Sequence, residues 1–211
     1  FFNPNGYETK LVPTNDGRLV IQEEWLEFFG KGMDKQPYNE GTGITPGSDE
    51  SKLKETKSRV AGYIRKYLDS WKIYHFHDTS DTARVKKPGD INNNLRLAPQ
   101  GENLAAFLYS IQDTPSYKKI VQTIQRMAPF FHDFILIPDK NNEEQIRLRW
   151  KQKGSDKYFD ANSLSDGTIR FICLTTLLLQ PELPKVILLD EPELGLHPYA
   201  IQLLAGMFKS A

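Results

Sequence analysis

Two adjacent carboxylates in the last quarter of the sequence have the type and spacing that metal-dependent chemistry needs. Asp190 and Glu191 follow four consecutive apolar residues, Val186–Leu189, and precede Pro192. Such a short, β-branched run predicts a strand buried on both faces, as in parallel sheets, whose ligands collect at the carboxyl ends of the strands. There, one acid can hold magnesium and the other can orient or deprotonate a water for phosphoryl transfer. The alternative interpretation is a buried strand that ends in an acidic turn.

A second motif, L-S-D-G-T, lies upstream of the acids and consists of Leu164, Ser165, Asp166, Gly167 and Thr168. Ser165 or Asp166 can cap a helix, and Gly167 allows the backbone to approach a ligand closely. The apolar stretch that follows predicts the helix itself, whose N-terminus offers free N–H groups and a positive dipole end to an anion. The alternative is an ordinary helix start with no ligand.

Together, these motifs resemble those of a known family. L-S-D-G-T is similar to the signature motif of ABC-type ATPases, and V-I-L-L-D-E is similar to their Walker B strand. E-L-G-L-H-P resembles the following D-loop, in the form found in SMC/RecF/OLD-like ATPases of the AAA family; its central residues are Leu194, Gly195, Leu196 and His197. Trp71–Leu108 also resembles bacterial ATPases of this group. The resemblance implies an α/β fold of the P-loop NTPase class, similar to an ABC-ATPase head, with an antiparallel β segment and a helical lobe.

The resemblance also implies an ATP-binding and hydrolysing head that forms a homodimer around ATP and Mg²⁺. The signature motif of one subunit would bind the ATP held by the other, through the Ser165 hydroxyl and the Gly167 N–H. Asp190 would hold Mg²⁺ through water, and Glu191 would be the catalytic residue that polarises the attacking water. The D-loop would lie at the dimer seam. The expected output is DNA-related or defence-related conformational work, with DNA as a candidate partner.

Two other functions remain open at this point. A nucleotide-binding subunit of an ABC transporter would be favoured by a basic, glutamine-rich continuation after the signature motif, whereas Ile169–Leu179 is mostly apolar with Arg170 as its one charge. A non-catalytic scaffold that keeps the ATPase architecture for partner binding is the second alternative.

No phosphate-binding P-loop can be assembled from this sequence. Such a loop needs G-x-x-x-x-G-K-[ST], whose backbone N–H groups cradle the phosphates. The single Gly-Lys pair, Gly30-Lys31, is followed by Gly32. We therefore expect an incomplete domain, an interior piece of a longer ATPase with a P-loop strand and helix upstream and the last strands downstream.

Composition places the chain among ordinary globular proteins. Its 211 residues are 39% hydrophobic and 26% charged, and 27 basic residues balance 27 acidic ones, so no global field favours nucleic acid or a membrane. The apolar stretches are far shorter than a bilayer span, and no secretory leader is visible. The single cysteine, Cys173, excludes an internal disulfide and fits a reducing compartment. We expect a cytoplasmic protein with no membrane partner.

Periodicity and turn residues divide the sequence into four parts. We predict an antiparallel β part over 1–29, a flexible loop over 30–51, a helical and signature lobe with a β-hairpin over 52–180, and a Walker B strand, D-loop and following helix over 181–211. The more detailed predictions are a hairpin turn at Pro13–Gly17, helices at Lys52–Trp71, Glu102–Gln112 and Thr114–Pro129, and strands at Phe134–Ile137, Gln145–Lys151 and Lys157–Ala161.

Two further features each have a functional and an ordinary interpretation. His75 and His77 lie on one side of a predicted strand next to Asp78, which permits metal binding, but no third or fourth ligand is apparent and packing or a loop anchor is the alternative. The helix Lys52–Trp71 carries a basic face that could contact nucleic-acid phosphates or could simply be solvated.

The absent phosphate cradle gives the first prediction. The 211-residue chain should neither hydrolyse ATP nor bind it tightly, because no backbone N–H cradle and P-loop lysine are available to the phosphates. Calorimetric titration with magnesium-ATP should detect no tight stoichiometric site. A tight site with one ATP per chain would show that another segment replaces the P-loop.

Overall fold

The computed structural model describes residues 5–28 and 38–210, which form two compact units, Phe1–Trp71 and Lys72–Ala211. The predicted loop over 30–51 is described only from residue 38 onward, and the Gly30-Lys31 pair lies outside the described residues. The four-part division therefore stays a prediction.

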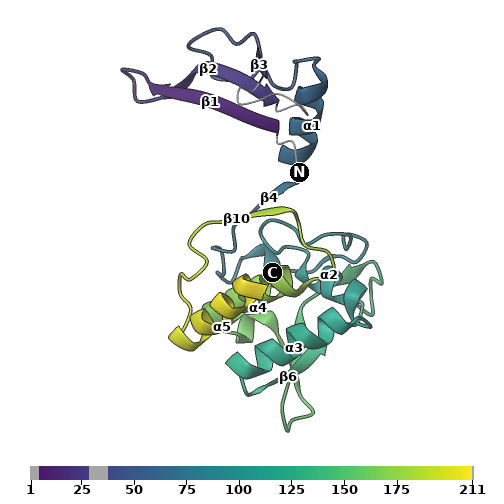
Figure 1. The fold of residues 1–211 in the computed structure, drawn as a ribbon. Coiled ribbons are helices and arrows are strands. Elements are labelled where there is room, and N and C mark those ends of the chain that lie inside the picture. Colours follow the sequence, from purple (N-terminus) through teal and green to yellow (C-terminus); the bar gives the residue numbers. More distant parts are fainter. Residues whose placement is uncertain (1–4, 29–37, 211) are drawn as a thin grey trace. The chain divides into compact units, whose positions relative to one another are not determined.

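The first unit is an antiparallel sheet with one helix (Figure 1). Strands β1 (Asn5–Pro13) and β2 (Leu19–Phe28) form the predicted hairpin, and β3 (Tyr38–Gly41) pairs with the other edge of β2. Gly17, with φ of 80°, supplies the left-handed residue of the turn. Helix α1 (Arg59–Leu68) packs its apolar face on this sheet.

Helix α1 is shorter than predicted. It begins after Ser58, whose side chain accepts a 3.0 Å hydrogen bond from the Ala61 N–H, while the residues from Lys52 onward form turns. The preceding turn is held by the buried Glu24 carboxylate, which accepts hydrogen bonds from the Lys52 N–H and from side chains of β1 and the flanking loops. Burial raises the pKa of Glu24, but hydrogen bonds from Ser51 and Thr42 outweigh it and leave the pKa lowered. The Arg65 guanidinium also donates to the carbonyls of Leu53, Lys54 and Thr56, so a side chain binds the carbonyls that a longer helix would use for its own hydrogen bonds.

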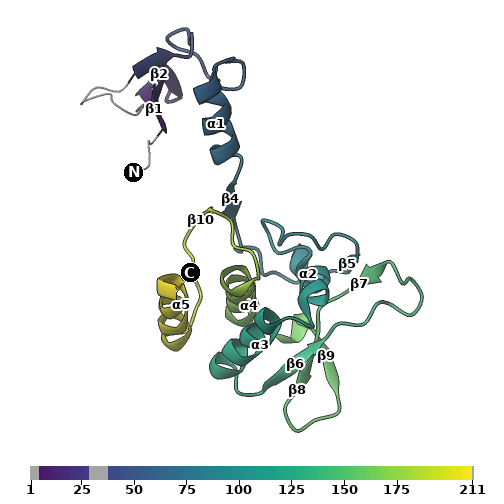
Figure 2. The same ribbon diagram turned by 45° about the vertical axis from the view of Figure 1, so that its right-hand side comes forward.

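The second unit contains four α-helices, three of which pack against one another, and several short sheets. The helices are α2 (Leu104–Ile111), α3 (Pro115–Met127), α4 (Asp166–Leu179) and α5 (Pro198–Ser210), with two 3-10 turns, η1 (Arg84–Lys86) and η2 (Ala161–Ser163). The strands are β4 (Trp71–Tyr74), β5 (Gly89–Asp90), β6 (Phe131–Ile135), β7 (Gln145–Ile146), β8 (Arg149–Gln152), β9 (Tyr158–Asp160) and β10 (Val186–Leu189). Figure 2 shows α3, α4 and α5 side by side, with β6, β8 and β9 next to α3.

Helix α4 is the centre of this unit. Its residues from Thr168 to Leu178 are all buried, so the helix is surrounded by other elements. Cys173 lies within it, and burial raises the pKa of its thiol to about 12, which keeps it protonated. A helix that is apolar on every side can be stable only in such a core.

The predicted strand Gln145–Lys151 is interrupted. Its first part, β7, pairs with β5, whereas β8 pairs with β6 and β9 in a separate antiparallel sheet. Leu148 lies between the two strands with its side chain buried, and its carbonyl accepts a hydrogen bond from the Ala161 N–H. One extended segment therefore serves two sheets, which alternation of apolar residues alone does not reveal.

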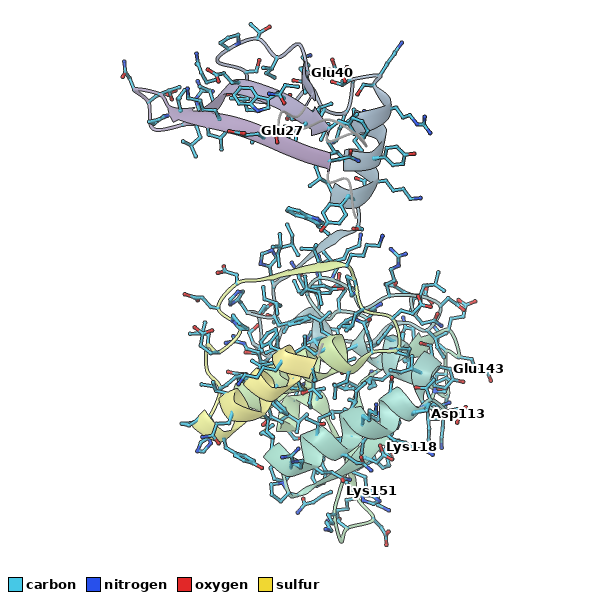
Figure 3. The ribbon with its side chains drawn as sticks, in the orientation of Figure 1. Glu27, Glu40, Asp113, Lys118, Glu143 and Lys151 are labelled. Carbon is cyan, nitrogen blue, oxygen red and sulfur yellow. The ribbon has the colours of Figure 1, made fainter. Side chains whose placement is uncertain are left out.

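Asp113, Lys118 and Glu143 are among the exposed charged side chains of the second unit (Figure 3). Among the described residues, no helix is both long and apolar enough to cross a membrane.

Candidate functional site

The acidic strand end is formed by β10 and the turn that follows it. The structure confirms a strand at Val186–Leu189 and places Asp190 directly after it, with its carboxylate exposed. The prediction that this strand is buried on both faces is wrong, because Leu188 is 40% exposed and its neighbours are only partly buried. Within the described part of the chain, β10 is hydrogen-bonded to β4 alone, so a second edge and part of its surface stay accessible.

Glu191 has an unusual backbone conformation. Its φ is +41°, and among the described residues it is the one non-glycine with a positive φ. A left-handed residue with a side chain is uncommon and costs of order 1 kcal/mol or more. The conformation turns the chain sharply, so that the Leu194 N–H bonds to the Glu191 carbonyl at 3.1 Å. Both predicted acidic residues are therefore exposed at a tight turn.

The L-S-D-G-T motif forms the N-terminus of α4. Ser165 is the N-cap, and its hydroxyl accepts a 3.3 Å hydrogen bond from the Thr168 N–H. Ser165 and Asp166 are exposed, whereas Leu164 and Thr168 are buried. The exposed pair can meet a ligand, and the buried pair attaches the helix start to the core.

The glycine of this motif packs directly on the D-loop backbone. A Cβ atom added to Gly167 would lie 2.5 Å from the Gly195 carbonyl oxygen, which is closer than a real side chain can approach. Gly195 has a φ of +71°, a conformation that glycine adopts readily. Two motifs that are distant in sequence are therefore in backbone contact, and glycine at both positions permits this.

Arg170 joins the signature helix to two other segments. Its guanidinium is buried and donates to the carbonyls of Phe76 at 3.0 Å, His77 at 3.1 Å and Leu194. In the sequence, Arg170 stands out only as the one charge in an apolar helix. A single arginine in an otherwise apolar helix is the sequence feature that could have indicated this role, because a buried arginine needs acceptors for its N–H groups.

Lys86 is a second cation next to the motif. Its side chain is only 3% exposed, and its ammonium lies 3.6 Å from the Asp166 carboxylate and 3.9 Å from that of Asp81. Asp78 is close enough that Lys86 contributes to lowering its pKa, although hydrogen bonds from Ser80 are the main cause. Two oppositely charged groups, Lys86 and Asp166, thus lie at the N-terminus of α4.

The histidine pair lies at the acidic strand end. His75, His77 and Asp190 each offer one ligand atom, and these three atoms lie within 4.8 Å of one another. His77 Nε2 is buried without a hydrogen-bond partner and is 4.0 Å from the nearer Asp190 oxygen. The third ligand that the sequence did not reveal is the same aspartate that the Walker B resemblance singles out.

The remaining D-loop residues lie on the surface between β10 and α5. Leu194 is 47% exposed, Gly195 is exposed, and Leu196 packs partly against the core. His197 is exposed, and its Nδ1 accepts a 3.3 Å hydrogen bond from the Tyr199 N–H at the start of α5. The arrangement presents carboxylates, a helix N-terminus and a surface loop in one continuous region, which suits the binding of a metal ion and an anion.

The contact between Gly167 and Gly195 gives the second prediction. Gly167→Ala should lower the free energy of unfolding by about 1–3 kcal/mol, because the added methyl group forces the D-loop backbone away from the helix. The control is Gly206→Ala, at an exposed helical position where an added Cβ meets nothing within 4 Å. That variant should be stabilised by up to about 1 kcal/mol. Denaturant melts of both variants measure the difference, and equal stability of the two would refute the backbone contact.

Comparison with known proteins identifies the family. Residues 27–211 match the family described as "AAA domain, putative AbiEii toxin, Type IV TA system". The match covers well over half of the chain, so the chain belongs to this family. No curated protein matches it. Membership supports a nucleotide-binding, ATPase-like function, which in AAA domains typically involves Mg²⁺.

Proposed function

We propose that this member of the AAA-domain family is the ATP-binding and hydrolysing head of an SMC/RecF/OLD-like ATPase with a P-loop NTPase fold, and that it works as a homodimer closed around ATP. The observation that carries this proposal is the packing of the L-S-D-G-T helix start on the D-loop, at Gly167 and Gly195, beside the acidic end of β10. The contact between Gly167 and Gly195, together with the hydrogen bond from the Leu194 N–H to the Glu191 carbonyl, supports a common role for the three motifs.

The start of α4 is suited to a phosphate group. The helix is 14 residues long, and its first turn presents an exposed serine and backbone N–H groups. Unpaired N–H groups and the positive end of the dipole favour an anion there. In the proposed dimer, Ser165 and the Gly167 N–H bind the phosphates of ATP held by the other subunit, and Lys86 offsets the negative charge of Asp166 next to them.

The two acids have different proposed roles. The exposed Asp190 carboxylate fits a magnesium ligand that acts through water, since Mg²⁺ keeps several waters and takes few protein oxygens. When bound, Mg²⁺ neutralises charge on the phosphates. Glu191 accepts a proton from the attacking water at its carboxylate, and its exposed position at the turn leaves that carboxylate free to do so.

The D-loop supplies the proposed dimer surface. Leu194 and His197 are exposed in a loop whose backbone is held to α4 from within by Gly167 and Arg170. A symmetric pair would complete both ATP sites at once, so that association and ATP occupancy become coupled. The family description refers to a toxin of a type IV toxin–antitoxin system, which favours defence-related over other conformational work.

A second function, a non-catalytic scaffold with the same architecture, would be favoured if the full-length protein also lacked a P-loop. The 211 residues contain no G-x-x-x-x-G-K-[ST] motif, so this sequence does not itself supply the phosphate cradle of the proposed head. The transporter subunit is not favoured, because Ile169–Leu179 forms a buried apolar helix. Measurements of ATP binding and turnover in the full-length protein separate the ATPase from the scaffold.

The third prediction concerns catalysis in the full-length protein. Glu191→Gln should nearly abolish ATP turnover and leave ATP binding intact, because the amide keeps the size of the side chain but cannot accept the proton. Glu182→Gln, at an exposed acid in the loop between α4 and β10, is the matched control and should keep wild-type turnover. Steady-state phosphate release and nucleotide titration measure the two quantities.

A small effect of Glu191→Gln would overturn the catalytic assignment. A kcat within about threefold of wild type corresponds to a barrier change of only ~0.7 kcal/mol. No turnover and no ATP binding in the wild-type full-length protein would instead favour the scaffold.

The fourth prediction concerns assembly. Ser165→Arg in the full-length protein should block ATP-driven dimerisation without unfolding the subunit, because a long side chain at the exposed helix start obstructs closure. If Ser165 is only a helix cap, the variant should lose about 1 kcal/mol of stability and assemble normally.

Light scattering and thermal melts, with and without ATP on the Glu191→Gln background, distinguish these outcomes. Gln202→Arg, which adds the same charge at an exposed position on α5, is the control and should dimerise as the parent does. Normal ATP-dependent dimers of the Ser165→Arg protein would contradict the proposal that the L-S-D-G-T motif binds the ATP held by the other subunit.

A further inference from the structure

Two imidazoles and one carboxylate converge at the end of β10. The ligand atoms of His75, His77 and Asp190 lie within 4.8 Å of one another. Tetrahedral ligands bound at 2.0–2.1 Å from a metal ion are about 3.4 Å apart. His75 is exposed and the Asp190 side chain is 72% exposed, so rotations of these two side chains can close the difference.

The third donor is already held in place. His77 Nε2 is buried, has no hydrogen-bond partner and lies 4.0 Å from Asp190 Oδ2. A buried ring nitrogen without a partner carries a desolvation cost, which a metal ion would offset. His77 Nε2 is therefore available to bind a metal ion next to the Asp190 carboxylate, because no hydrogen bond competes for it.

The backbone that carries the two histidines is fixed from both sides. The His75 N–H donates to the Pro99 carbonyl at 2.8 Å, and Arg170 binds the carbonyls of Phe76 and His77. Asp190 is fixed through β10, which pairs with β4 immediately before the histidines. His75 and Asp190 each come directly after a strand of this pair, and ligands next to paired strands are positioned more precisely than ligands on free loops.

We propose that His75, His77 and Asp190 form a binding site for a divalent transition-metal ion, for which zinc is the best-matched ion. Two nitrogen donors and one oxygen donor suit zinc and related ions, whereas Mg²⁺ and Ca²⁺ prefer oxygen donors alone. Three protein ligands leave a fourth position open to water or to an oxygen of a bound anion.

This site goes beyond the proposed ATPase function, because it needs no nucleotide. It shares Asp190 with the proposed magnesium site, but the two histidines belong to the zinc site alone. Histidine variants therefore test the zinc site separately, whereas Glu191→Gln tests ATP hydrolysis separately.

The test is calorimetric titration of the nucleotide-free chain with Zn²⁺. We expect one Zn²⁺ per chain, retained in a large molar excess of Mg²⁺. His75→Ala and Asp190→Asn should each weaken binding by about 10–100-fold or more, since the loss of even an outer-shell partner has an effect of that size. His132→Ala removes an exposed histidine on β6 and should leave the affinity unchanged.

A spectroscopic measurement distinguishes the loss of a metal ligand from misfolding of the His77 variant. Co²⁺ in place of Zn²⁺ should give visible absorption bands typical of low-coordinate imidazole ligation, and these should weaken in His75→Ala and His77→Ala proteins that melt like wild type. Zinc binding that survives both histidine substitutions, that is lost in His132→Ala, or that Mg²⁺ displaces at comparable concentration would overturn the proposal.

Discussion

The buried guanidinium of Arg170 is the interaction on which the candidate site depends. It donates to three backbone carbonyls, from Phe76, His77 and Leu194, and so joins α4, the histidine segment and the D-loop. Burial of a cation is costly unless its donors are satisfied, and here carbonyl oxygens provide that compensation. Hydrogen bonds to charged groups each contribute about 1.5–3 kcal/mol to stability. Removing the guanidinium would therefore be costly, and it would leave α4, the histidine segment and the D-loop without the side chain that joins them.

The sequence allowed prediction of those features that depend on local geometry. Ser165 and Thr114 cap their helices as expected, and the Pro13–Gly17 turn closes the first hairpin, because capping and turn preferences act over a few residues. The start of α1 was not predictable in this way. The buried Glu24 carboxylate, which is distant in sequence, binds the Lys52 N–H of the preceding turn, and Arg65 binds the carbonyls of Leu53 and Thr56 that a longer helix would use.

The proposed metal ligands also show what local sequence patterns cannot predict. The sequence predicts that His75 and His77 share one side of a strand, but β4 ends at Tyr74, before both histidines. Their third ligand is Asp190, directly after a strand more than a hundred positions away in the sequence. Only the pairing of β4 with β10 brings them together. Alternation within one strand predicts which side chains share a face, whereas the identity of the neighbouring strand is a property of the whole fold.

The same connections link the D-loop to the histidines. Gly167 blocks inward movement of the D-loop through its contact with the Gly195 carbonyl, and Arg170 resists outward movement by holding the Leu194 carbonyl. The guanidinium is planar and its N–H groups have a fixed fork geometry, so it cannot follow Leu194 without changing its bonds to Phe76 and His77. A partner that displaces the D-loop therefore also acts on the backbone that orients the His77 ring toward Asp190. The surface proposed for dimerisation and the ligands proposed for the metal ion are thus joined through one side chain.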